Sequence, residues 1–186
     1  MNHSTGILYF LLAISMNSST AQERYYTKSG EIRFSSESSL EKIEAINRNV
    51  TCVLDTRTGL LQLMVLMKGF EFKKALMQEH FNENYVESDK YPKSEFKGQV
   101  LNSGEIKYNK DGSYELKIRG LLSMHGVTKE VETIGKITVS GEKIESSAAF
   151  NILLSDFKIK IPTLVKENVS NKVTITVSCL LDILKS

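Results

Sequence analysis

The chain has 186 residues, a formal net charge of +2 and a charged fraction of 25%. This length is typical of one domain with a sizeable core, and the charge content is that of an ordinary water-exposed surface. Lysine and arginine are scattered along the chain rather than clustered, which excludes a nucleic-acid footprint. No internal repeat of fixed period is visible.

The amino-terminal segment has the features of a secretory signal. Ile7–Ile14 is an apolar run that is too short to span a bilayer. Ser19-Thr20-Ala21 then fits a small-x-small cleavage site, which would leave Gln22 as the new N-terminus. The segment before the apolar run contains His3 but no lysine or arginine, so the alternative is a frayed apolar N-terminus of a cytosolic protein.

We therefore expect a signal peptide over residues 1–21, one domain over residues 22–186, and a periplasmic or secreted location. No later segment is long and apolar enough to form a transmembrane helix.

The two cysteines lie in stretches of alternating apolar residues. Cys52 shares its parity with Leu54, and Cys179 shares its parity with Val177, so both side chains are expected to point inward. They could form a disulfide in an oxidising compartment or act as two small buried hydrophobic residues. The second reading is favoured, because the sequence alone does not place the two sulfurs together.

The first third of the domain reads as paired strands. Tyr25–Ser36 is a strand, or a hairpin with a turn at Ser29-Gly30. Leu40–Asn47 fits a helix or a strand, and a strand is favoured because Val50–Leu54 continues with a clear period of two. Thr58-Gly59 then turns the chain into the next strand, which predicts a hairpin.

A change of period marks the centre of the chain. Leu60–Phe72 is a nearly unbroken apolar run, typical of a strand that is buried on both faces. From Lys73 the apolar side chains recur three and four residues apart, which predicts a short amphipathic α-helix over about Lys73–Asn84. A turn at Ser88–Pro92 follows. A sheet covered by such a helix is a plausible container for an apolar molecule.

Turn-punctuated strands fill the rest of the chain. Asn109-Lys110-Asp111-Gly112, His125-Gly126 and Ser140-Gly141 are turn signals. The expected strands between and around them are Phe96–Ser103, Glu105–Asn109, Tyr114–Leu122, Thr128–Val139, Lys143–Leu154 and Lys172–Leu184.

The inward parity changes near the end of the strand that begins at Lys143. Ile152 and Leu154 share one register, whereas Phe157 and Ile159 share the other. One extra residue would keep both sets inward, which predicts a β-bulge at Ser155-Asp156 before Pro162 ends the strand.

Eight or nine strands with one short helix indicate a mainly β fold, either an antiparallel barrel or a sandwich. Closure into a barrel would remove the free edge of the last strand. A barrel of eight strands is about wide enough to hold one small ligand.

Three stretches resemble one known family. They are Ala75–Pro92 running on into Phe96-Lys97-Gly98, then Gly120–Lys129, and finally Ala149–Pro162. Together they are similar to the YceI-like family of secreted bacterial proteins, with a fitting order and spacing over roughly the whole mature chain. Ser35–Val50 is shorter and more acidic than the corresponding stretch in most of the family.

The resemblance implies a lipocalin-like antiparallel β-barrel of about eight strands with an elongated apolar pore. It also implies binding of a long-chain isoprenoid or acyl lipid, such as a polyisoprenoid, an isoprenoid quinone or a fatty-acid derivative. No catalytic residues are established for the family as a whole.

The candidate ligand-binding surface consists of inward aromatic and methionine side chains. These could simply fill the core of a small barrel, but with the resemblance they are interpreted as the lining of a cavity. Apolar burial, at about 25 cal/mol per Å² removed from water, would then drive binding. The candidates are Phe70, Phe72, Met77, Phe81, Phe96, Met124, Phe150 and Phe157.

His80 and His125 are the histidines of the mature chain. They could form a metal pair, act as a general base, bind a lipid head group, or order a loop. A zinc site needs three or four ligands at characteristic spacing, and none is evident. Ser123 near His125, and Ser155 beside Asp156, are too weak a signal for a nucleophile held by a base.

We therefore expect no catalytic residues, no metal and no cofactor, and we interpret the two Asn-x-Ser/Thr patterns at Asn49 and Asn168 as chance. The predicted function is that of a periplasmic or secreted lipid-binding protein. The alternatives are an enzyme that acts on such a lipid through His80 or His125, and a filled barrel that works through its outer surface as a stress or assembly factor. A homodimer is left open, because exposed strands of an incompletely closed barrel could pair between subunits.

Overall fold

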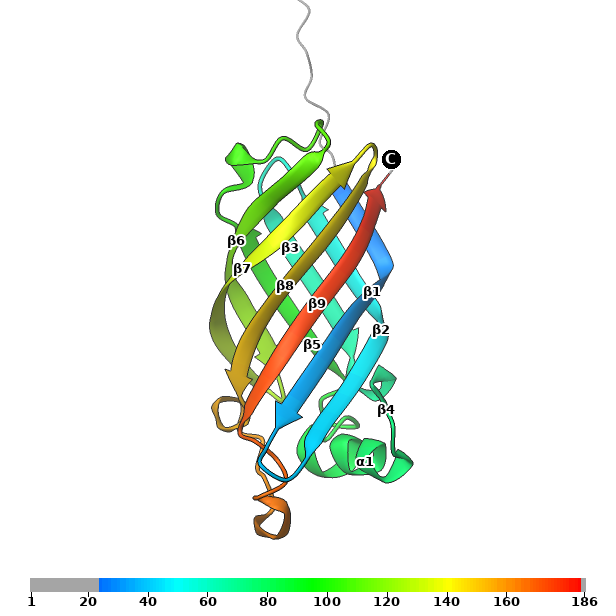
Figure 1. Ribbon diagram of the computed structural model, residues 1–186, viewed down its shortest axis with the longest axis vertical. Coiled ribbons are helices and arrows are strands. Elements are labelled where there is room, and N and C mark those ends of the chain that lie inside the picture. The colour runs from blue at the N-terminus through cyan, green and yellow to red at the C-terminus, as the bar shows by residue number, and fades with distance from the viewer. Residues whose placement is uncertain (1–23, 185–186) are drawn as a thin grey trace, which may run out of the picture.

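The computed structural model describes residues 24–184, and within them eight long antiparallel strands close into a barrel (Figure 1). A short ninth strand, β4 (Glu71–Phe72), pairs with β2 beside the ring. The eight strands of the ring are β1 (Arg24–Glu37), β2 (Lys42–Asp55), β3 (Leu60–Leu66), β5 (Lys93–Val100), β6 (Gly112–Met124), β7 (Val127–Ser140), β8 (Lys143–Leu153) and β9 (Lys172–Ile183).

The ring runs β1-β2-β3-β5-β6-β7-β8-β9 and returns to β1. Phe34 of β1 shows the closure, since it lies opposite Ala45 of β2 on one side and Ile175 of β9 on the other. Both edges of the sheet are therefore paired, as the free-edge argument predicted. The fold is a lipocalin-like barrel and not a sandwich.

β1 is one continuous strand, and the hairpin considered at Ser29-Gly30 is wrong. The chain instead bulges there, with shifts of the β1–β2 register on both sides of Gly30. The bulge changes the parity of the strand, so that Tyr25 before it and Ile32 after it both face the interior. The hairpin of β2 and β3 through Thr58-Gly59 is confirmed, and Gly59 supplies the positive φ of 73° that this turn needs.

The expected strand Leu60–Phe72 is too long, because β3 ends at Leu66. The buried side chain of Asn47 donates from Nδ2 to the Leu66 carbonyl at 2.9 Å, which takes that acceptor out of the strand ladder. A 3₁₀ turn over Met67–Gly69 follows, and Gly69 lies so close that a Cβ there would come within 2.7 Å of Asn47 Nδ2. The chain then resumes as β4 beside β2.

The expected strand Glu105–Asn109 is also wrong. This segment holds a 3₁₀ turn over Ser103–Glu105 and inserts the buried Ile106 into one end of the barrel. Asn102 fixes the loop, since its Oδ1 accepts from the Lys117 backbone N–H at 2.9 Å. The loop therefore works as a plug of the barrel and not as part of the sheet.

No β-bulge forms at Ser155-Asp156, because β8 has already ended at Leu153. A 3₁₀ turn over Leu154–Phe157 and a left-handed residue, Lys158 with φ 58°, carry the chain away from the sheet. These two features place both Phe157 and Ile159 in the core. The inward position of both residues was expected, but the predicted β-bulge is not what produces it.

One short α-helix is present among the described residues, as expected. It is α1 (Ala75–His80), and a π-helical turn over Phe81–Tyr85 extends it. The helix lies at the end of the barrel that is lowest in Figure 1, together with the β1–β2 turn and the loop that connects β8 to β9.

The expected signal peptide lies outside the described residues. Within residues 24–184, none of the helices has the length and apolar character required to cross a bilayer.

Candidate ligand-binding cavity

The interior of the barrel is hollow at mid-height. An almost wholly apolar cavity of about 130 Å³, here called the inner cavity, is lined by side chains from every strand of the ring. The inward positions around it carry small residues, including Ala148 on β8, Gly135 on β7 and a glycine pair between β5 and β6. Small residues at inward positions leave the space that a packed barrel core would fill.

The glycine pair consists of Gly98 and Gly120, which lie opposite each other in the β5–β6 ladder. A Cβ on Gly120 would come within 2.4 Å of the Gly98 Cα, so neither position has room for a side chain. The ring of Phe96 covers the pair, at 2.6 Å from a Cβ built on either glycine. The pair thus lets an aromatic ring lie flat against the barrel wall.

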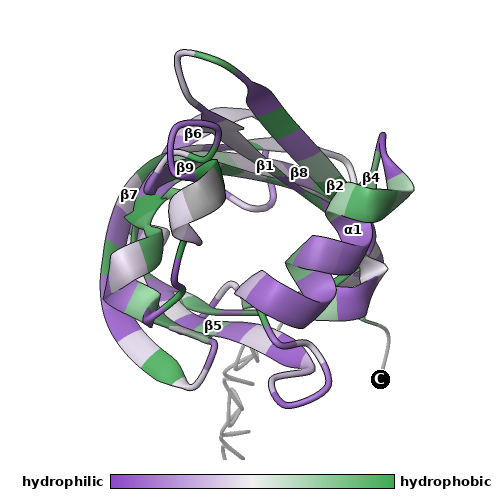
Figure 2. Ribbon diagram, turned by 90° about the horizontal axis from the view of Figure 1, so that it is seen from below, coloured by the Kyte–Doolittle hydropathy of each residue, from purple (hydrophilic) through white to green (hydrophobic). Residues whose placement is uncertain are grey.

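A second cavity, the mouth cavity, has a volume of about 300 Å³ and lies beneath α1. Its walls come from the lower ends of β1, β8 and β9, from α1 with its π-helical extension, and from the β8–β9 loop. Figure 2 views this end of the barrel and shows α1 lying across one side of the opening.

The two cavities share a wall, so they follow one another along the barrel. The residues that line both are Met67, Phe70, Met124, Ile152 and Ile175. Together the cavities fall within the range of about 300–1,000 Å³ that is typical of small-molecule sites. Their shape suits a long, narrow apolar ligand.

An aromatic cluster surrounds the passage from the mouth. It joins Phe34 of β1, Phe70, Phe72 of β4 and Phe81. Neighbouring ring centroids in this cluster lie 5.1–5.6 Å apart, within the range of favourable aromatic contacts. Because each phenylalanine side chain has only two rotatable bonds, the cluster forms a rigid apolar surface.

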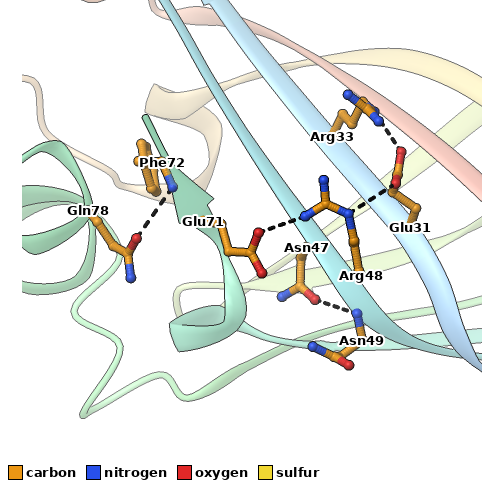
Figure 3. A network of polar contacts seen from close by, with 8 residues as sticks. All are labelled: Glu31, Arg33, Asn47, Arg48, Asn49, Glu71, Phe72 and Gln78. Atoms are coloured by element: carbon orange, nitrogen blue, oxygen red, sulfur yellow. Dashed lines mark hydrogen bonds and ion pairs between the residues drawn. The ribbon is translucent and has the colours of Figure 1, made fainter. Parts of the chain in front are cut away.

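A polar network outside the barrel holds β4 in place (Figure 3). Arg48 bridges Glu71 of β4 at 2.6 Å and Glu31 of β1 at 3.8 Å. The Gln78 side chain of α1 accepts from the Phe72 backbone N–H at 3.3 Å. These contacts fasten both the aromatic cluster and the helix to the ring.

Seven of the eight residues expected to line a cavity do so. Phe96 and Phe150 line the inner cavity, Phe72, Met77 and Phe81 line the mouth cavity, and Phe70 and Met124 line both. Phe157 lines neither, because it is 2% exposed and packs within the lower core cluster.

Sequence reasoning missed four aromatic or methionine residues that line the cavities, namely Phe34, Met64, Met67 and Tyr85. Phe34 shares the inward face of β1 with Ile32, while Glu31 and Arg33 take the outward positions, and this alternation was the signal that could have added Phe34 to the site.

A few polar side chains border the mouth cavity. Tyr85 reaches it from the π-helical turn and Asn168 from the β8–β9 loop, and exposed His80 lies on the helix. Burial raises the pKa of the Tyr85 phenol, so this hydroxyl stays protonated and able to donate. Glu41 also lines the mouth and pairs with Lys74 at 3.3 Å.

His125 has a structural position. Its Nδ1 lies 2.9 Å from the Phe157 carbonyl and its Nε2 lies 2.8 Å from the Glu87 carboxylate, while its ring packs edge-on against Tyr91. A carbonyl oxygen only accepts, so Nδ1 is the donor of the bond to Phe157. His125 lines neither cavity and instead joins the β6–β7 turn to two loops.

Cys52 and Cys179 are free thiols that meet on the wall of the inner cavity. The hydrogen bond with Cys179, together with burial, raises the pKa of the Cys52 thiol, so Cys52 contributes to the wall as a small apolar group. Gly30 on β1 leaves the room for this contact, since a Cβ there would lie 2.8 Å from Cys179 Sγ.

Across residues 24–184, no group of three or more histidine, cysteine, aspartate or glutamate side chains is arranged to hold a metal ion.

A closed antiparallel barrel whose apolar interior reaches one helix-covered end places the protein in the class of lipocalin-like barrels. Residues 12–180 match the family model of the YceI-like domain, and the chain belongs to the YceI-like family.

Solved structures with the same fold are distant in sequence. A polyisoprenoid binding domain from Saccharophagus degradans, implicated in plant cell wall breakdown, superposes with a TM-score of 0.75 at 13% identity, over 88% of this chain and 99% of that one. BcnA of Burkholderia cenocepacia gives a TM-score of 0.67 at 14% identity, over 82% and 95%. The YCEI protein of Campylobacter jejuni gives 0.56 at 15% identity, over 100% and 94%. No curated protein matches the chain.

Proposed function

We propose that this protein binds a long apolar lipid inside the barrel: a polyisoprenoid, an isoprenoid quinone or a fatty-acid derivative. The observation that carries the proposal is the apolar passage formed by the inner cavity and the mouth cavity. The similarity to a domain described as polyisoprenoid binding supports the same ligand class.

Apolar burial is the source of the proposed affinity. Each buried methylene contributes about 0.8 kcal/mol, so a chain that fills both cavities binds with few polar contacts. The proposal therefore expects affinity to rise with tail length until the tail reaches the end of the inner cavity, and to level off beyond that length.

The proposed orientation places the tail at mid-barrel and the head group at the mouth. The inner cavity offers almost no polar surface, whereas Tyr85, Asn168 and His80 supply hydrogen-bonding groups at the mouth. A head group with oxygen acceptors matches the phenolic O–H of Tyr85 and the amide N–H of Asn168.

We propose a periplasmic or secreted location, supported by the apolar run Ile7–Ile14 and the small-residue site that ends at Ala21. Intact-mass measurement of the protein recovered from the exported fraction of producing cells tests this. A mass that begins at Gln22 supports export, and a full-length protein confined to the cytoplasm contradicts it.

Native mass spectrometry of the purified protein, followed by lipid extraction, tests the binding function. A co-purifying prenyl or acyl chain that is lost on denaturation supports it. An interior that takes up neither the cellular lipid nor an added fluorescent fatty acid refutes it. The same native mass spectrum shows whether the protein is a monomer or a homodimer, a question that the sequence leaves open.

We propose a binding role and not an enzymatic one. Of the two histidines, His80 lines the mouth cavity, and His125 is held between a carbonyl and a carboxylate away from both cavities. Incubation of the bound lipid with wild-type protein and with His80→Ala separates the alternatives. Unchanged lipid with both proteins supports a carrier, and turnover that only the wild type performs supports an enzyme.

A further inference from the structure

The barrel wall is incompletely paired between β7 and β8, which are neighbours on the front of the barrel in Figure 1. The ladder that joins them begins at the β7–β8 turn and ends where Gly135 lies opposite Ala148. Below that point, residues 127–134 of β7 stay paired with β6, and residues 149–153 of β8 stay paired with β9. Within residues 24–184, these two facing edges are not joined to each other by the ladder, and we call them the side seam.

Both edges of the side seam line the inner cavity. Val131 and Thr133 contribute from β7, and Phe150 and Ile152 contribute from β8. The cavity therefore reaches the seam from within the barrel. Backbone N–H and C=O groups that point into the seam lack the ladder bonds made elsewhere in the ring, so they need water or another polar partner.

Lys129 indicates that water reaches the inner face of β7 beside the seam. It lies opposite Leu122 of β6, whose side chain lines the inner cavity, so the register places Lys129 on the inward face. Lys129 is nevertheless exposed, and it lines neither cavity. Because no β8 ladder stands beside this position, an inward lysine can reach solvent through the side of the barrel.

Side-chain hydrogen bonds tie the seam at its two ends. At the upper end, Thr133 Oγ1 donates to the Ala149 carbonyl at 2.9 Å. At the lower end, His125 Nδ1 donates to the Phe157 carbonyl at 2.9 Å, which joins the β6–β7 turn to the 3₁₀ turn that follows β8. A wall held by such single bonds opens locally more easily than a wall held by a continuous ladder.

We propose that the side seam is a gate through which the ligand enters and leaves the inner cavity, with the bond from His125 to the Phe157 carbonyl as its latch. When the latch opens, the lower parts of β7 and β8 separate while the ladder above them keeps the ring closed. The inference rests on the proposed function, because its ligand is the same long apolar lipid. Side entry suits such a ligand, since the tail need not pass end first through the rigid aromatic cluster below the inner cavity.

A cleavable bridge across the seam tests the gate. The variant E132C/N151C places two cysteines at exposed positions that would lie opposite each other if the ladder continued. A bismaleimide with a reducible disulfide then joins them. The control T138C/E145C puts the same bridge across the paired part of β7 and β8, where residues 138 and 145 do lie opposite each other.

Stopped-flow uptake of a fluorescent fatty acid gives the result, once intact mass has confirmed one bridging linker per molecule. Cys52 and Cys179 are buried, so the linker reacts first with the introduced cysteines. The bridge across the seam should slow both uptake and release on the order of tenfold at an unchanged Kd, because a blocked route changes both rates equally. Reduction of the linker should restore the wild-type rates, and the control bridge should leave them unchanged.

The latch is tested without a linker. His125→Asn keeps a residue that tolerates the φ of 51° but removes the ring that reaches the Phe157 carbonyl. Both uptake and release should become several-fold faster at an unchanged Kd. Asn102→Ala is the control, since it removes two hydrogen bonds of the plug loop at the far end of the barrel and should leave both rates unchanged.

The outcomes keep this inference distinct from the proposed function. If the fatty acid binds wild type and only the seam bridge slows its exchange, both proposals stand. If the fatty acid binds but the seam bridge leaves the rates unchanged, or both bridges slow them alike, the gate is overturned and the lipid-binding proposal stands. If wild type takes up neither the fatty acid nor a cellular lipid, the lipid-binding proposal fails and the gate fails with it.

Discussion

The two ends of the barrel differ in how tightly their side chains are packed. At the plugged end, aliphatic side chains such as Ile137, Val139 and Ile144 are at most 2% exposed and interlock beneath the loop that carries Ile106. At the mouth, Met77 and Phe81 are only half-buried and stand over a cavity of about 300 Å³. The contrast indicates that the packed, plugged end contributes more of the stability of the fold, whereas the mouth end leaves space for a ligand.

The largest effect is expected from the packed end. Ile144→Ala should lower the free energy of unfolding by about 2–5 kcal/mol, because Ile144 is fully buried and borders neither cavity, so the substitution leaves a hole in a packed core. Met77→Ala at the mouth should cost about 1 kcal/mol or less, since its side chain already borders empty space. Urea denaturation of both variants gives the comparison, and equal losses would remove the distinction between the ends.

Filling the interior should separate binding from folding. Ala148→Phe places a ring in the inner cavity and is expected to weaken a long-chain ligand about ten- to a hundredfold, with a smaller effect on a short acyl chain that occupies the mouth alone. Ala149→Phe is the matched control, because its side chain points to the outer surface. Titration with a fluorescent fatty acid measures both, and equal affinity in the two variants would contradict the placement of the tail.

A polar contact also stabilises the mouth end. His125→Ala should cost about 1–2 kcal/mol, because it leaves the Phe157 carbonyl unpaired and places a less tolerant residue at a φ of 51°. Thr128→Ala, which removes an exposed hydroxyl contact in the same hairpin, should change stability by less than about 0.5 kcal/mol. Thermal unfolding measures both, and similar values would show that His125 contributes nothing beyond an ordinary surface residue.

The smallest effect is a pH dependence at the plugged end. Burial raises the pKa of Tyr108, against the opposing effect of its hydrogen bond with Ser103. The folded state thus favours the neutral phenol, so this contribution is fully present below the ordinary pKa of about 10 and is lost as pH rises through the higher folded pKa. Tyr108→Phe should reduce the alkaline loss of stability, and unfolding curves above pH 9 that superpose on wild type would contradict this.

The period of two was sufficient to predict the strands, and it left a barrel or a sandwich open. The free edge of the last strand and the family resemblance then favoured the barrel. In β7, Val131, Gly135 and Ile137 share the inward face, while Glu130, Glu132 and Lys136 lie on the outward face, and the observed register follows that alternation. Local turn chemistry, as at Gly59, then fixed which strands are neighbours.

The failures lie where a distant side chain decides the local structure. Asn47 ends β3 through a bond to a residue 19 positions away, and nothing within Leu60–Phe72 signals it. Phe157 looked like a lining residue, but its carbonyl is tied to His125, 32 positions earlier, and its ring joins the core. The hollow itself was visible in principle, since Gly98, Gly120 and Ala148 all fall on inward positions.

Closure through β1 and β9 has a consequence for how the molecule is made. The Ser36 hydroxyl meets the Ser170 carbonyl across 134 positions of sequence, and β1 cannot complete its hydrogen bonds until β9 has been synthesised. Contacts between segments so far apart are slow to form, because the whole intervening chain must first be brought together. Until β9 is available, the nascent chain exposes unpaired strand edges and apolar surface that are prone to aggregate. A chaperone would therefore be needed most during this interval.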